Sequence, residues 1–134
     1  MNDRTQGLRT RLRRTPRPLL DQVRATQPGL RPAVARDVEA ACVQRNEPVP
    51  VGRLALAFHA LRLAWCTDAF EALIWYRIQA ASDRRGIPLV PTIAHRRAQA
   101  RAGVAVGRPV HIAPGVLLPH GQVVIDGLTR IGAG

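Results

Sequence analysis

The chain has 134 residues, of which 46% are apolar and 4% aromatic, so its core must consist mainly of Ala, Val, Leu and Ile. This length suits one domain or one and a half. No run reaches the roughly 18 consecutive apolar residues of a membrane span, and the N-terminus lacks a signal-peptide type of apolar stretch. We therefore expect a cytoplasmic protein with no membrane partner.

The formal net charge is +11, and every basic residue is an arginine. Nine of the 20 arginines fall within residues 1–36, where the acids are Asp3 and Asp21. A basic arm for nucleic acid is one interpretation of this segment. No aromatic side chain lies among these arginines to stack on bases, so we do not expect a nucleic-acid partner. Residues 1–32 are instead predicted to form a basic, Pro-rich and mobile leader.

The middle of the chain, residues 33–103, is predicted to be a helical domain. The apolar spacing and the Pro and Gly breaks predict helices over 33–45, 53–66, 68–84 and 91–102. The second of these is apolar on most faces and should be largely buried, with its densest stripe at Leu54, Ala57, Phe58, Leu61 and Trp65. His59, within the same helix, is predicted to serve packing or to lie on the surface.

Local signals refine this helical domain. Asp68 and Glu71 are spaced as in a capping box, which predicts the start of the third helix. Cys42 and Cys66 each occur singly in apolar helical patterns, so both are predicted to be buried and unpaired. The chain has no CxxC and no His-rich spacing, so no metal site is expected.

A six-residue repeat of aliphatic side chains organises residues 104–134. Val106, Ile112 and Leu118 lie six apart, a seven-residue step reaches Ile125, and six more reach Ile131. A helix needs a period of 3.6 and an ordinary strand a period of two, so neither explains the repeat. The repeat predicts a solenoid of short parallel strands around a narrow core. The alternative, a Gly- and Pro-rich loop of 31 residues, would be unusual in a compact domain.

The seven-residue step places a histidine at a corner of this predicted coil. The extra residue falls within Pro119–Gln122, where an insertion should bulge outward and carry His120 with it. Aliphatic residues on both sides would hold the imidazole on a rigid frame. His111 lies in the middle of a hexad and is predicted to face outward as a surface residue.

Two motifs together resemble the bacterial serine O-acetyltransferases. One is the H-G-x-V-V-I element at His120, set among the hexads, and the other is F-x-A-L-x-x-Y-R-I at 70–78. The resemblance covers about half the chain, from Phe70 to the end. It implies an α+β fold in which an N-terminal all-α domain precedes the first coils of a left-handed parallel β-helix. It also implies acetyl-CoA as co-substrate with no bound cofactor, a small hydroxyl acceptor, a role in cysteine biosynthesis, and a homotrimer or a dimer of trimers.

The resemblance assigns His120 as the general base that takes the proton of the acceptor hydroxyl. Tyr76 and Arg77 are interpreted first as a structural pair that anchors the helical domain, with a substrate contact as the alternative. Two positions depart from the family. Its orienting acid is replaced by Ala105, and the Asp before its histidine is replaced by Pro119.

These departures leave several interpretations open. A Pro-His pair also occurs in related hexapeptide acyltransferases that act on sugars or other alcohols. Asp126 is a weak candidate for a substrate contact. The CoA-binding residues are expected beyond Gly134, so we expect the chain to be a fragment of a longer acetyltransferase. The alternative is a non-catalytic assembly module.

Overall fold

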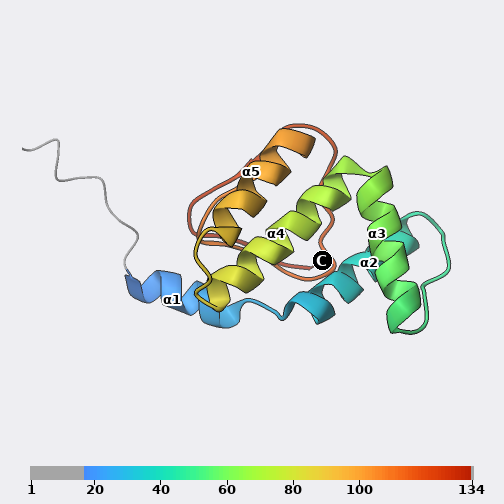
Figure 1. Ribbon diagram of the computed structural model, residues 1–134, viewed down its shortest axis with the longest axis horizontal. Helices are drawn as coiled ribbons and strands as arrows, with labels where there is room; N and C mark the ends of the chain where they lie inside the picture. Colours follow the sequence, from blue (N-terminus) through green and yellow to red (C-terminus); the bar gives the residue numbers. More distant parts are fainter. Residues whose placement is uncertain (1–16, 134) are drawn as a thin grey trace, which may run out of the picture.

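The computed structural model describes residues 17–133, which form five helices followed by four short strands (Figure 1). This order confirms the predicted α+β class. In Figure 1, α4 crosses the middle of the molecule with α5 beside it, and the strand segment runs behind this pair. The elements are α1 (Arg17–Thr26), α2 (Leu30–Gln44), α3 (Arg53–Cys66), α4 (Asp68–Arg84), α5 (Val90–Ala102), β1 (Val104–Val106), β2 (Val110–Ile112), β3 (Val123–Ile125) and β4 (Thr129–Ile131).

The N-terminal segment differs from the predicted mobile leader. Of residues 1–32, residues 17–32 form α1, a short connector and the first turn of α2, while 1–16 lie outside the described part. The connector is held at Gln27, whose buried side chain donates a hydrogen bond to the Val110 carbonyl at 2.9 Å. Arg84 in turn donates to the Gln27 carbonyl at 3.2 Å. Long-range hydrogen bonds, which composition does not reveal, therefore fix this segment.

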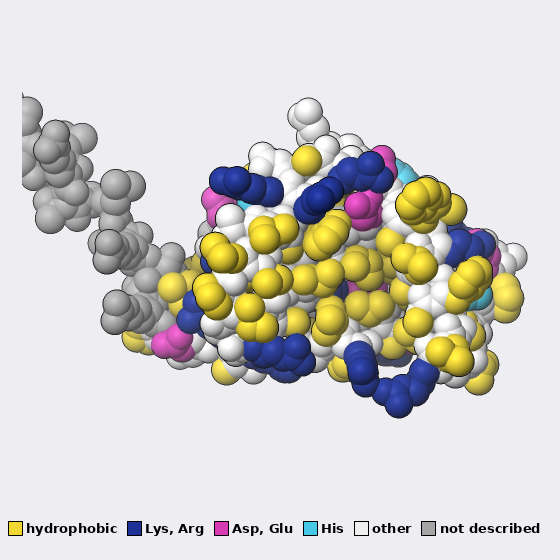
Figure 2. Space-filling view, in the orientation of Figure 1, with side chains coloured by type: hydrophobic (Ala, Val, Ile, Leu, Met, Phe, Trp, Pro, Cys, Tyr) yellow, Lys and Arg dark blue, Asp and Glu magenta, His cyan; other side chains and the backbone are white. Residues whose placement is uncertain are grey.

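Helix α3 has the predicted bounds, but the prediction that it is largely buried is wrong. Leu63 is its one fully buried residue. Side chains of the predicted core stripe face solvent instead, with exposed fractions of 88% for Leu54, 66% for Phe58, 69% for Leu61 and 86% for Trp65. Figure 2 shows hydrophobic side chains exposed over the right-hand part of the molecule, where Figure 1 places α3. The helix packs on α2 and α4 through its opposite face.

The two cysteines have different environments. Cys42 in α2 is buried as predicted, and burial raises the pKa of its thiol. Cys66 at the end of α3 is exposed, so the prediction of its burial is wrong. Both thiols are free.

The start of α4 differs from the predicted capping box. Thr67 is the N-cap, and no side chain caps the helix there. The Thr67 hydroxyl oxygen accepts a hydrogen bond from Arg45 at 2.6 Å. The Glu71 carboxylate accepts hydrogen bonds from Trp75 of the same helix and from Arg101 of α5. It therefore does not cap a backbone N–H at the start of α4, as the capping box would require.

The four strands pair in parallel as the hexad pattern requires. Val104 in β1 pairs with Val123 in β3, and Val110 in β2 pairs with Thr129 in β4. Both registers are offset by 19 residues, which equals three hexads plus the one extra residue. The five aliphatic side chains of the repeat all belong to one hydrophobic cluster: Val106, Ile112, Leu118, Ile125 and Ile131. The prediction of short parallel strands is therefore confirmed for four of the five hexads, while Leu118 lies outside the strands that the structure describes.

Helix α4 joins the two hydrophobic clusters of the molecule. Leu73 and Tyr76 pack in the cluster with the strands. Phe70, one turn earlier, packs with Val38 of α2 and Leu63 of α3. The helix thus connects the coil to α2 and α3. No helix within residues 17–133 combines the length and the apolar character needed to cross a membrane.

Candidate active site

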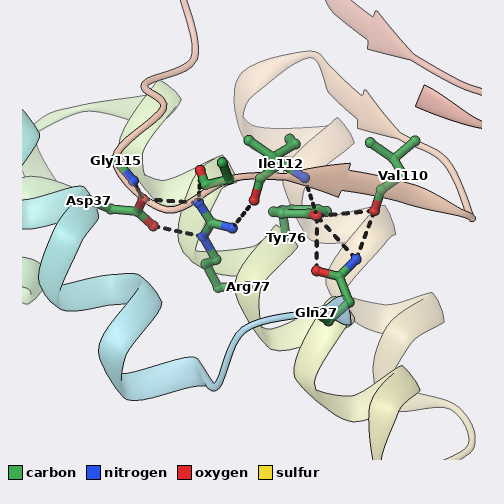
Figure 3. A network of polar contacts seen from close by, with 8 residues as sticks. Gln27, Asp37, Tyr76, Arg77, Val110, Ile112 and Gly115 are labelled. Atoms are coloured by element: carbon green, nitrogen blue, oxygen red, sulfur yellow. Dashed lines mark hydrogen bonds and ion pairs between the residues drawn. The ribbon is translucent and has the colours of Figure 1, made fainter. Parts of the chain in front are cut away.

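A buried polar network ties the helices to the free edge of β2 (Figure 3). The Tyr76 hydroxyl accepts a hydrogen bond from the Ile112 N–H at 2.9 Å and donates one to the Val110 carbonyl at 3.1 Å. Since β4 is the only strand that pairs with β2 within residues 17–133, these polar groups would otherwise be buried without partners. Tyr76 and Gln27 therefore take the place of a neighbouring strand.

The second half of the network is an ion pair inside the protein. Arg77 Nε lies 2.7 Å from Asp37 Oδ2, and Arg77 Nη2 lies 3.0 Å from Asp37 Oδ1. The guanidinium also donates to the carbonyls of Ile112 at 2.6 Å and Ala113 at 3.0 Å. Asp37 accepts one more hydrogen bond, from the Gly115 N–H at 2.8 Å. Among the described residues, no buried side-chain nitrogen or oxygen is left without a partner.

These contacts confirm the prediction that Tyr76 and Arg77 anchor the helical domain. Sequence reasoning missed their partners Gln27 and Asp37. A signal for Asp37 was present, because it lies four residues after Ala33 and four before Ala41, on the buried face of α2. An acid on an apolar helix face requires a buried cation or hydrogen-bond donors. Burial also raises the pKa of Tyr76, although its hydrogen bonds to Ile112 and Gln27 act in the opposite direction.

The anchored segment leads directly to the corner that carries His120. Gly115 is fixed through Asp37, and Leu117 and Leu118 then pack against the hydrophobic clusters. Pro119 and His120 follow, both exposed, before β3 begins. His120 thus lies in an exposed bend between Leu118 and β3.

His120 lines a cavity of about 350 Å³ between this corner and the helices. The cavity has an apolar side made by α3, α4 and the corner, and a polar side that includes Arg45 and Thr67. Because Arg45 is hydrogen-bonded to Thr67, its guanidinium is held at the cavity. The lining residues are Ala41, Gln44, Arg45, Leu63, Thr67, Ala69, Phe70, Leu73, Leu117, Leu118, Pro119 and His120.

The arrangement combines three chemical capabilities in one cavity. An imidazole can exchange a proton near neutral pH. A guanidinium can bind a carboxylate or phosphate through two donors. The apolar side can exclude water from part of a bound ligand. No carboxylate is among the lining residues.

The other residues considered from the sequence lie apart from this cavity. Ala105 lies in β1 and pairs with Val124. Asp126 follows β3, at the opposite end of that strand from His120. Its carboxylate accepts a hydrogen bond from the Gly127 N–H at 2.7 Å, and its carbonyl accepts one from the Thr129 hydroxyl at 2.7 Å. The contacts of Asp126 are those of a turn.

The remaining histidines contact backbone carbonyls. His111 points out of β2, as predicted, and its ring lies 3.3 Å from the Thr26 carbonyl. His59 contacts the Ala55 carbonyl of its own helix, and His95 of α5 contacts the Val106 carbonyl at 3.0 Å. Within residues 17–133, no three His, Cys, Asp or Glu side chains form a group that could hold a metal ion.

Comparison of the chain with protein-family models, with curated proteins and with solved structures gives no match.

Proposed function

We propose that this chain carries the general-base half of an acyltransferase site, which moves an acetyl group from acetyl-CoA to a small hydroxyl acceptor. Serine is the acceptor that the resemblance to serine O-acetyltransferases implies, and the cytoplasm and cysteine biosynthesis are its setting. In this proposal the four strands begin a left-handed parallel β-helix and the chains assemble as trimers or paired trimers. The observation that carries the proposal is the position of His120, exposed in the bend before β3 and lining a cavity.

The proposed reaction needs one base and one leaving thiolate. His120 takes the proton from the acceptor hydroxyl as the oxygen attacks the thioester carbonyl carbon. The carbon–sulfur bond then breaks, the CoA thiolate leaves, and the imidazolium returns the proton to it. A positioned base of this kind contributes about 10²–10⁴-fold to the rate. Arg45 lies in the same cavity and is suited to bind an anionic group of a ligand.

A second candidate is a non-catalytic assembly module. This candidate is favoured because the site has no acid to orient the base. Ala105 stands where the family has its orienting acid, and none of the residues that line the cavity is a carboxylate. An acetyltransferase for a sugar or another alcohol is an intermediate possibility, because Pro119 stands where the family has the Asp that contacts serine.

The test is release of free CoA thiol from acetyl-CoA by the purified chain, with serine, other amino alcohols and sugars supplied in turn. Release without acceptor is subtracted, because the exposed Cys66 also reacts with thiol reagents. We expect His120→Ala to lower acceptor-dependent release by at least about 100-fold. His59→Ala is the control, because the ring of His59 contacts only its own helix among the described hydrogen bonds. Unchanged turnover in His120→Ala would exclude the role proposed for it, and no release with any acceptor would favour the assembly module.

A further inference from the structure

Arg45 is the only Arg, Lys, Asp or Glu among the described residues that line the His120 cavity. It is the C-cap of α2, at the helix end whose dipole favours a cation. Its Nη2 atom donates to the Thr67 hydroxyl at 2.6 Å, while Glu47, the acid nearest in sequence, pairs with Arg62. No ion pair within residues 17–133 involves Arg45, so its other N–H donors can bind an anionic ligand.

Large apolar side chains form a wall of the same cavity. All of them belong to or pack against the two hydrophobic clusters, so their positions are fixed by the fold rather than by a ligand. These residues are Leu63, Phe70, Leu73, Leu117 and Leu118. Pro119 adds an apolar ring directly beside His120. A ligand that fills the cavity therefore places part of its surface on a preformed apolar wall.

The size of the cavity favours a ligand larger than serine. Its volume of about 350 Å³ equals that of on the order of twelve molecules of liquid water. Serine, with a single hydroxymethyl side chain, would leave much of this space and the apolar wall to water. An aliphatic chain would displace that water, and each methylene that it buries raises the affinity about fourfold.

The charge of the cavity favours a hydroxy acid over an amino acid. The carboxylate of either ligand can bind the Arg45 guanidinium through two donors. An amino acid also brings its ammonium group close to that carboxylate, and hence close to the guanidinium, where the two positive charges repel each other. A hydroxy acid makes the same carboxylate contact without this repulsion.

We infer that the His120 cavity binds a hydroxy acid with an aliphatic chain. Its carboxylate lies on Arg45, its hydroxyl at His120 and its chain on the apolar wall. The role of this hydroxyl as the acyl acceptor rests on the proposed function, whereas the binding of the acid does not. In the reaction, the hydroxyl oxygen bonds to the acetyl carbon as the carbon–sulfur bond breaks, and its proton passes through His120 to the CoA thiolate.

Titration calorimetry on the full chain, without acetyl-CoA, tests the class of ligand. The probes are β-hydroxypropanoate, β-hydroxybutanoate and β-hydroxyhexanoate, with serine as the amino acid that matches the first of them. We expect the affinity to rise about fourfold with each added methylene, and β-hydroxypropanoate to bind more tightly than serine. The NMR signals of the His120 imidazole, assigned by their loss in His120→Ala, should shift during the titration, which places the acid in the cavity.

Arg45→Gln tests the carboxylate contact. In the wild type we expect β-hydroxyhexanoate to bind about tenfold more tightly than its neutral amide, because hydrogen bonds between charged groups are stronger than neutral ones. Arg45→Gln should remove this preference and keep the gain with chain length, and Arg45→Lys should retain part of the preference. Arg36→Gln is the matched control, since Arg36 lies on the same helix, pairs with Glu39 at the surface and does not line the cavity.

Thiol release from acetyl-CoA separates this inference from the proposed function. Binding with these preferences but without release would support the assignment of the ligand and contradict the proposed reaction. Faster release with serine than with β-hydroxyhexanoate would support the reaction and overturn the inference. An affinity that does not rise with chain length, unshifted His120 signals, or a carboxylate preference that survives Arg45→Gln would also overturn it.

Discussion

The carboxylate of Asp37 and the guanidinium of Arg77 form a two-point ion pair in which the side chains expose 0% and 2% of their surface, respectively. The pair joins α2 to α4, and both partners also bind the backbone of the coil. A buried pair costs desolvation, which complete hydrogen bonding offsets. Here the pair does more than join two helices, because it fixes the segment that leads to His120.

Asp37→Ala should therefore destabilise the protein strongly. The substitution leaves the Arg77 charge buried without its partner, which costs about 3–5 kcal/mol in the free energy of unfolding. Chemical denaturation measures the loss. Glu39→Ala in the same helix is the matched control, since Glu39 pairs with Arg36 at the surface and its removal should cost only a small fraction of that amount. Equal losses in the two variants would contradict the anchoring role.

Tyr76→Phe isolates the hydroxyl contacts with β2. The ring and its packing remain, while the Ile112 N–H loses its acceptor and the Val110 carbonyl loses one of its two donors. We expect a loss of about 1–3 kcal/mol in the free energy of unfolding. Native-state hydrogen exchange should locate the effect, with faster exchange at the Ile112 amide than in the wild type. Unchanged protection at that amide would show that the hydroxyl does not cap the strand edge.

Ionisation of the same residue predicts a pH dependence. Burial raises the pKa of Tyr76 in the folded protein above its usual value of 10. Above that pH the unfolded chain loses the phenolic proton first and binds fewer protons than the folded chain, so stability falls as pH rises toward the folded pKa. Below the pKa of the unfolded chain, the contribution of Tyr76 to the free energy of unfolding does not change with pH.

The chain contains a single tyrosine, so tyrosinate absorbance reports this group alone. We expect its midpoint to lie above that of the unfolded chain. Stability measured across the alkaline range should decline more steeply in the wild type than in Tyr76→Phe. A midpoint equal to that of the unfolded chain would contradict the burial of the hydroxyl.

The sequence predicts most of the local structure because the signals are local. Pro and Gly residues separate the helices, and the repeat depends on one aliphatic side chain at about every sixth residue. The single slip in that repeat also falls in the exposed bend that carries His120. The predicted capping box does not form, because the Glu71 carboxylate accepts hydrogen bonds from Trp75 and Arg101 instead. The spacing of residues along one helix cannot reveal these partners.

The sequence does not show which apolar face of a helix packs against the rest of the chain. Helix α3 is apolar on nearly every side, so its composition indicates burial without saying against what. Only the packing shows that Leu63 faces the core and Phe58 faces solvent. In the same way Arg45 joins His120 in one cavity through tertiary contacts, since 75 residues separate them and no motif links them.

Gly107 and Asp126 give the last prediction, which separates a turn role from a substrate role for Asp126. A Cβ added at Gly107 would meet the Oδ1 atom of Asp126, and that atom is held by the Gly127 N–H. We expect Gly107→Ala to cost about 1–3 kcal/mol in the free energy of unfolding, because neither group can move without losing a contact.

Combining Gly107→Ala with Asp126→Ala should recover much of that loss, since the second change removes the clashing oxygen. A double-mutant cycle in the free energy of unfolding measures the coupling. If Asp126 serves only the turn, Asp126→Ala alone lowers stability but leaves acceptor-dependent thiol release per folded molecule unchanged. A higher KM for the acceptor, with the fold intact, would instead restore Asp126 as a substrate contact.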